Sequence, residues 1–176
     1  MYELIKRAKS GEKKAFDELL LKYKSDLYKV ARAKLSNVED IAEVFQETAC
    51  SAYKYINKLK EEKYFKTWIT RILINKCNNH YKKKKYVKEV SFKEIESLTV
   101  VDDYYGDSEF GNIIESLKSE EKLILTLYYG QKYTTKEIAK MLKTNENTIK
   151  TKIRRAKKKL EEMKEKNKED VEVWTN

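Results

Sequence analysis

The segment from residue 144 to residue 160, TNENTIKTKIRRAKKKL, carries seven basic residues and one acidic residue. Asn145 can cap the start of a helix here. Apolar residues then recur at the spacing of one buried helical stripe: Ile149, Ile153, Ala156 and Leu160. The other faces carry lysine, arginine and threonine, which suit contacts to the phosphates and base edges of nucleic acid. The alternative is a solvated charged face, a common meaning of such a run.

A shorter helix is predicted directly before this basic helix. Thr134 and Glu137 have the spacing of a capping box, and the apolar periodicity ends near Lys143. Ala139 is a small residue that allows the two helices to approach closely. A short helix, a tight turn and a longer basic helix are typical of a helix-turn-helix, whose second helix enters the major groove of DNA. A merely charged helical hairpin is the alternative.

Composition indicates the class of partner. The net charge of +10 favours a polyanion, either nucleic acid or an acidic membrane surface. The sequence has no apolar run of 18 residues and no signal-peptide pattern, so we expect a soluble, cytoplasmic protein.

Few residues suit catalysis or metal binding. Cys50 and Cys77 lie far apart and are expected to be reduced structural thiols, and the only histidine, His80, is expected at the surface or against the backbone. The sequence contains no Ser/His/Asp set and no glycine-rich phosphate cradle. We therefore expect no enzyme, metal site, cofactor or small-molecule substrate.

The elements that must position the basic helix are expected to be helical throughout. Proline is absent and only four glycines occur, so the predicted fold is all-α, with two small helical domains joined by an acidic flexible linker. The linker is residues 87–112, which carry seven acidic residues and two lysines. The expected limits are 1–86 for the first domain, 113–165 for the helix-turn-helix domain and 166–176 for a tail.

Three segments of the first domain have helical periodicity. Residues 1–16 suggest one amphipathic helix, and the stripe from Ala15 to Leu35 suggests a helix that breaks near Ser25. The next helix is expected to begin after Ser36, with Glu39 at capping-box distance. A further helix is expected from about Lys66 to Lys84.

Opposite charges are segregated along this domain. Residues 37–47 carry four acidic residues and no base, whereas residues 63–85 carry eight bases and no acid. Aromatic rings among bases suit single-stranded nucleic acid, because bases stack on rings while lysines meet phosphates. These rings could equally belong to the core: we expect Phe65 and at least part of Trp68 to be buried, with Tyr64 and the asparagines available to DNA.

Three motifs resemble the extracytoplasmic-function group of bacterial sigma factors, which contain sigma regions two and four. DIAEVFQET (40–48) resembles the family's acidic helix, and FKTWITRILINKCNNHYKKKK (65–85) its Phe-x-Thr-Trp pattern. YTTKEIAKMLKTNENTIKTKIRRAKKKL (133–160) resembles the helix-turn-helix of region four. The sequence departs from the family pattern at Lys118, where a proline is usual, at Asn79, where aspartate is usual, and at Asn147, where glycine is usual.

The resemblance implies an alternative sigma factor that binds core RNA polymerase and initiates transcription at specific promoters. The implied partners are the β′ clamp helices and β flap of core polymerase, promoter DNA and an anti-sigma factor, which can hold the protein at the inner membrane face. The implied core-binding residues are Asp40, Glu43, Gln46 and Glu47. The implied −10 contacts are Lys63, Tyr64, Lys66, Trp68, Arg71, Asn75, Asn78, Asn79, Lys82 and Lys83. The implied −35 contacts are Thr134, Thr135, Thr148, Lys150, Thr151, Lys152, Arg154, Arg155 and Lys157.

The family's linker threads polymerase channels, and residues 57–64 would receive a flipped-out base of the non-template strand. A stand-alone helix-turn-helix regulator is the second hypothesis, and a structural or interaction protein with solvated charges is the third. Neither of these alternatives uses all three charged segments.

Overall fold

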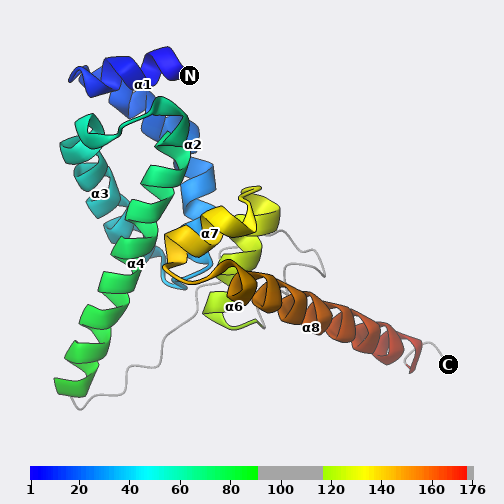
Figure 1. Cartoon of the computed structure of the whole chain (residues 1–176). Coiled ribbons are helices and arrows are strands. Elements are labelled where there is room, and N and C mark those ends of the chain that lie inside the picture. Colours follow the sequence, from blue (N-terminus) through cyan, green and yellow to red (C-terminus); the bar gives the residue numbers. More distant parts are fainter. Residues whose placement is uncertain (91–116, 174–176) are drawn as a thin grey trace. The chain divides into compact units, whose positions relative to one another are not determined.

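Helices form all the regular structure in the residues that the computed structural model describes, 1–90 and 117–173, with side chains described for 1–84 and 117–163. The all-α prediction is confirmed. The chain divides into two units, residues 1–100 and 101–176. Figure 1 shows the helices of both units coloured along the sequence.

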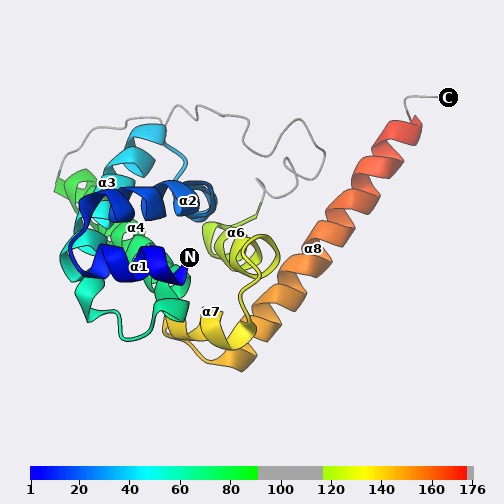
Figure 2. The same cartoon turned by 90° about the horizontal axis from the view of Figure 1, so that it is seen from above.

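The first unit is a bundle of four α-helices. They are α1 (Tyr2–Lys9), α2 (Lys13–Arg32), α3 (Val38–Tyr55) and α4 (Phe65–Val90), with two 3₁₀ turns, η1 (Ile56–Lys58) and η2 (Glu62–Tyr64), between α3 and α4. Helices α2, α3 and α4 all pack against one another, and α1 packs on α2 (Figures 1 and 2). Their apolar stripes meet in a core that includes Leu19, Leu27, Val44, Ile69 and Leu73. Burial of these stripes stabilises the bundle.

Three helix boundaries in this unit differ from the sequence prediction. Residues 1–16 are not one helix, because the chain turns at Ser10 and Gly11, where Gly11 has a φ of 96° that favours glycine. Helix α2 runs through Ser25 without a break. The cap of α3 is Asn37 rather than Ser36, and its side-chain oxygen accepts a 3.0 Å hydrogen bond from the backbone N–H of Asp40.

The second unit contains the predicted helix-turn-helix. Its elements are α6 (Ser119–Leu125), the π-helical turn η3 (Thr126–Gly130), α7 (Thr135–Leu142) and α8 (Glu146–Val173). Leu117, Leu125 and Ala156 are buried together, and Leu160 packs against them. Figures 1 and 2 show α8 continuing beyond α6 and α7.

The ends of α4 and α8 lie beyond the domain limits that the sequence suggested. Helix α4 continues to Val90, so the first residues assigned to the linker are helical, and the rest of the linker lies outside the described residues. Helix α8 continues to Val173, so most of the expected tail is helical as well. The first described helix of the second unit, α6, begins at Ser119, directly after Lys118. The domain limits themselves remain predictions.

The described residues hold neither a membrane-spanning helix nor a metal-binding cluster. None of the helices there is both long and apolar enough to cross a membrane. No group of three or more histidine, cysteine, aspartate or glutamate side chains in the same residues is arranged to bind a metal ion.

Candidate nucleic-acid and protein-binding surfaces

The turn between α7 and α8 is fixed by hydrogen bonds at the start of each helix. The Thr134 hydroxyl accepts a 3.2 Å bond from the Glu137 N–H, and the Glu137 carboxylate accepts a 2.9 Å bond from the Thr134 N–H, which is the predicted capping box. Helix α7 ends at Lys143, which has left-handed dihedral angles (φ 54°). The Asn145 side chain then accepts a 2.7 Å bond from the Thr148 N–H and so caps α8.

A side-chain hydrogen bond joins the two helices of the motif. The Thr135 hydroxyl donates to the Glu146 carboxylate at 2.8 Å, and Lys150 lies 3.0 Å from the same carboxylate. The Thr135 hydrogen bond, followed by that of Lys150, lowers the pKa of Glu146. Ala139 of α7 and Ile149 of α8 are both buried, and the two helices pack against each other. The start of α8 is therefore held in a defined orientation.

One face of α8 presents basic side chains to solvent. Arg154 and Arg155 are exposed, and neither forms an ion pair within the described residues. Lys150 and Thr151 lie on neighbouring positions of the same face, and Lys157 pairs with Glu161 at 3.5 Å. This arrangement fits a helix whose first turns read base edges while longer side chains meet phosphates.

Lys152 lies on another face of α8. Its ammonium group contacts Glu120 of α6, and Lys159, seven residues further on, lies 2.6 Å from Glu121. These two ion pairs join α6 to α8. Among the candidate −35 residues, Lys152 therefore suits a structural role best, because it holds α8 against α6. The list predicted from the sequence omitted Asn147, which is exposed. Asn147, Lys150 and Arg154 follow one another at spacings of three and four residues, so they share one face of α8.

Five of the candidate −10 residues form one exposed stripe along α4. They are Arg71, Asn75, Asn78, Asn79 and Lys82. Their spacing of three and four residues places them on one side of the helix. Asparagine amides offer a donor and an acceptor to base edges, and the flanking bases suit phosphates.

The other candidate −10 residues lie elsewhere. Lys63 and Tyr64 are in η2, with the Lys63 ammonium 4.8 Å from the Tyr64 ring centroid. Lys66 pairs with Asp26 of α2 at 3.0 Å. Trp68 is partly buried, with its ring 5.9 Å from that of buried Phe65. Lys83 faces α3, where it lies 3.6 Å from Glu47.

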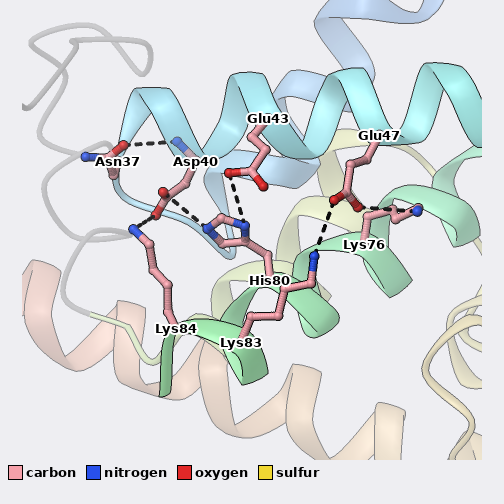
Figure 3. A network of polar contacts seen from close by, with 8 residues as sticks. All are labelled: Asn37, Asp40, Glu43, Glu47, Lys76, His80, Lys83 and Lys84. Atoms are coloured by element: carbon pink, nitrogen blue, oxygen red, sulfur yellow. Dashed lines mark hydrogen bonds and ion pairs between the residues drawn. The ribbon is translucent and has the colours of Figure 1, made fainter. Parts of the chain in front are cut away.

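The acidic residues of α3 face a row of bases on α4 (Figure 3). Asp40 contacts Lys84 at 2.5 Å and His80 Nε2 at 3.2 Å. Glu43 lies 3.7 Å from His80 Nδ1. The contacts of Glu47 are to Lys76 at 3.3 Å and to Lys83. Asp40 and Glu47 are therefore paired with lysines of α4, whereas Glu43 lies beside the His80 ring.

The acids of this face differ in how far they remain accessible. The side chain of Glu43 is 56% exposed, whereas that of Asp40 is 16% exposed and that of Glu47 is 35% exposed. Gln46 is exposed. Partial burial raises the pKa of Glu47, but hydrogen bonding and charge from Lys76 and Lys83 outweigh this effect, so its pKa is lowered. Glu43 and Gln46 are thus the most available groups for a partner.

His80 and one of the two cysteines, Cys77, are buried. The expectation that His80 lies at the surface is wrong, since it is 8% exposed and its ring lies between Asp40 and Glu43. The signal that would have found this is the spacing of Lys76, His80 and Lys84 at every fourth residue, opposite Asp40 and Glu43. Both cysteines are free thiols, with Cys50 exposed and Cys77 buried.

Comparison with known proteins identifies the two units. Residues 19–86 match the family model "Sigma-70 region 2", and residues 108–160 match "Sigma-70, region 4". These matches cover the α4 stripe and the helix-turn-helix respectively. Together they span about two thirds of the chain.

Curated relatives extend over most of the sequence. The chain is 26% identical to the RNA polymerase sigma factor SigV of Bacillus subtilis over 77% of this chain and 82% of the relative. It is 27% identical to the ECF RNA polymerase sigma factor SigW of the same organism over 89% and 92%, respectively.

Solved structures share the fold. The sigma factor RpoE of Bartonella quintana, solved in complex with the anti-sigma factor NepR, is similar with a TM-score of 0.73 and 21% identity, over 86% of this chain and 98% of that one. CnrH, solved with the cytosolic domain of CnrY, gives a TM-score of 0.66 and 20% identity over 93% and 96%. With both sigma regions present in this order and relatives that match nearly end to end, the chain belongs to the extracytoplasmic-function group of the sigma-70 family.

Proposed function

We propose that this chain is an alternative sigma factor that binds core RNA polymerase, recognises −10 and −35 promoter elements and initiates transcription of a specific set of genes. One observation carries the proposal. Helices α4 and α8 each present an exposed polar and basic face, and these faces lie in the segments that match sigma region two and sigma region four, respectively. Sigma factors are transcription initiation factors, and we assign no catalytic residue.

The contacts are divided between the two units. We assign −10 recognition to the stripe from Arg71 to Lys82, with Tyr64 near the separated strand, because amides and rings can read unpaired bases. Recognition of the −35 element falls to the exposed start of α8, mainly Lys150, Thr151, Arg154 and Arg155. Thr134, Thr135 and Thr148 are proposed to hold the starts of α7 and α8 at the same groove, because their hydroxyls donate to Glu137, Glu146 and Asn145.

Core polymerase is proposed to bind the exposed edge of the acidic face. Glu43 and Gln46 lie outermost there, so the basic β′ clamp helices meet these groups first. Asp40 and Glu47 add negative potential while they also pair with α4. The second unit is proposed to bind the β flap. The partner that controls this activity is proposed to be an anti-sigma factor, as in the solved complexes of RpoE and CnrH, with the protein cytoplasmic or held at the inner membrane face.

Transcription with purified core polymerase on a library of randomised promoters tests the proposal. We expect enrichment of templates with two conserved boxes, one near position −10 and one near −35, and no enrichment with core polymerase alone. A stand-alone regulator would enrich a single operator motif in a binding selection without polymerase and would give no transcript. That outcome would overturn the proposal.

A further inference from the structure

The single histidine of the chain, His80, is buried where α4 packs on α3 (Figure 3). Its Nε2 atom lies 3.2 Å from the Asp40 carboxylate, and its Nδ1 atom lies 3.7 Å from the Glu43 carboxylate. The ring is therefore placed between two acids of the face that is proposed to bind core polymerase. Because the ring is covered, His80 itself makes none of the proposed contacts with polymerase or DNA.

The hydrogen bonding of the ring depends on its charge. Within the described residues, Nε2 is buried and forms no aligned hydrogen bond, although Asp40 lies close to it. A buried polar atom without a partner is unfavourable. A neutral imidazole has one N–H group and can donate to only one carboxylate, whereas the charged ring has two. Protonation therefore allows His80 to donate to Asp40 and Glu43 together.

The two acids differ in their other contacts. Asp40 is also paired with Lys84, and its side chain is 16% exposed. The Glu43 side chain is 56% exposed, and His80 is its single ion-pair neighbour among the described residues. Glu43 can therefore turn either toward the ring or outward to a partner. A charge on His80 acts mainly on Glu43, which is also the acid most available to polymerase.

Other charged groups surround His80 at a greater distance. Lys76 and Lys84 flank it on α4, one turn before and one turn after, and each is paired with an acid of α3. The charge of Lys34, which follows α2, reaches Cys77, one turn of α4 before the ring. The groups of η2 precede α4 and lie about 22 Å before the ring along the helix. In the described part of the chain, the two acids of α3 are the only charged groups within ion-pairing distance of the ring.

We infer that His80 is a positioning residue of the acidic face, and that its protonation draws Glu43 toward α4 and so weakens the contact with core polymerase. The charged ring adds one positive charge beside the docking acids, and the basic clamp helices are repelled by it. It also competes with those helices for the Glu43 carboxylate. Both effects have the same sign, so binding to core polymerase should decrease as the pH falls through the range in which histidines gain a proton. This inference rests on the proposed docking of core polymerase at this face.

The test compares the affinity of the full-length protein for core polymerase at pH 8 and at pH 6. Core polymerase has titratable groups of its own, so each variant is compared with the wild type against the same core preparation. The variants His80→Gln and His80→Phe contain no histidine. Between pH 8 and pH 6 we expect the wild type to lose at least about fivefold in affinity relative to both variants, the lower end of typical coupling between two sites. Thermal unfolding shows whether each variant is folded at both pH values.

A second measurement follows the charge of the ring without a substitution at position 80. Because the chain has one histidine, ¹³C-labelled protein gives one histidine ring signal in an NMR spectrum. We expect this signal to change over the same pH range as core binding. Glu43→Gln removes the acid that the ring draws inward, so it should reduce the pH dependence of core binding.

Two results would overturn the inference while the proposed function stands. One is an equal change in core affinity with pH for the wild type and the His80 variants. The other is a ring signal that stays constant between pH 8 and pH 6. If the wild-type protein binds core polymerase at neither pH, the proposed function and this inference are both wrong.

Discussion

At the scale of single residues, the bases of this protein fall into two classes. Lys66, Lys83 and Lys152 pair with acids on other helices and so contribute to packing. Arg71 and Arg154 are exposed without an ion pair in the described part of the chain. An unpaired arginine keeps its five donors available for phosphate or guanine, because no internal contact must be broken first. DNA recognition is assigned mainly to the unpaired class, although Lys150, which pairs with Glu146 of the same helix, also belongs to the −35 surface.

This division gives a prediction for the −35 element. Arg154→Ala is expected to weaken promoter use by about 1–3 kcal/mol and to relax the preference for one base of the −35 box, as for loss of a base-edge contact. Lys152→Ala is the matched control, and it is expected to leave the base preference unchanged while loosening the contact with Glu120. Transcription from a library randomised at the −35 box measures both. Unchanged preference in Arg154→Ala would remove Arg154 from the reading surface.

The two cysteines are expected to react very differently. Burial raises the pKa of the Cys77 thiol to about 12, so at pH 8 it carries almost no thiolate, the reactive form. Cys50 is exposed and should react with a maleimide within minutes, whereas Cys77 should react only after unfolding. In a Cys50→Ser variant Cys77 is the one remaining thiol, so mass spectrometry then measures the labelling of Cys77 alone. Rapid labelling of Cys77 in the folded variant would contradict the described packing of α4.

At the scale of helices, the contact between α3 and α4 decides how the polymerase interface can be tested. Asp40 and Glu47 join α3 to the bases of α4, so reversing their charge would oppose like charges inside the bundle. A loss of polymerase binding would then be confused with a loss of folding. Glu43 and Gln46 avoid this problem because they are the more exposed members of the face.

Introducing positive charge at these two positions is therefore the sharper experiment. Glu43→Lys combined with Gln46→Lys is expected to weaken binding to core polymerase at least tenfold, because like charges would meet the basic clamp helices. Glu18→Lys, at an exposed position of α2, is the matched control, and this variant should bind core polymerase normally. Thermal unfolding followed by circular dichroism should show intact helices in all variants. Core binding of the double variant at wild-type affinity would rule out this face as the docking surface.

The sequence predicted the helices better than their contacts. The stripe on α3, including Ile41, Val44 and Ala52, is buried as its spacing indicates, and the capping box at Thr134 forms. The cap at Asn37 could not be chosen over Ser36, because both side chains can accept the same hydrogen bond. The burial of His80 depends on how α3 packs on α4, so the spacing of Lys76, His80 and Lys84 indicates it only when that spacing is compared with the acids of α3.

At the scale of the whole molecule, charge explains why one chain can serve two partners. The chain carries a net charge of +10, yet the segments 37–47 and 87–112 together carry eleven acidic residues against two lysines. A basic protein surface and anionic DNA can therefore bind separate segments, and each partner is repelled by the segment of the other. Without polymerase, the remaining attraction to duplex DNA is mainly phosphate contact, which is weak at physiological salt and does not select a sequence.

The measurement that tests this account most directly is a footprint of one promoter fragment with the protein alone, core polymerase alone and the two together. We predict weak, salt-sensitive and non-specific binding by the protein alone, because the −10 surface requires separated strands. Together with core, we predict specific protection of both boxes, permanganate-reactive thymines near −10 and a run-off transcript. Tight specific protection by the protein alone, with no strand opening when core is added, would contradict the account and identify a stand-alone regulator.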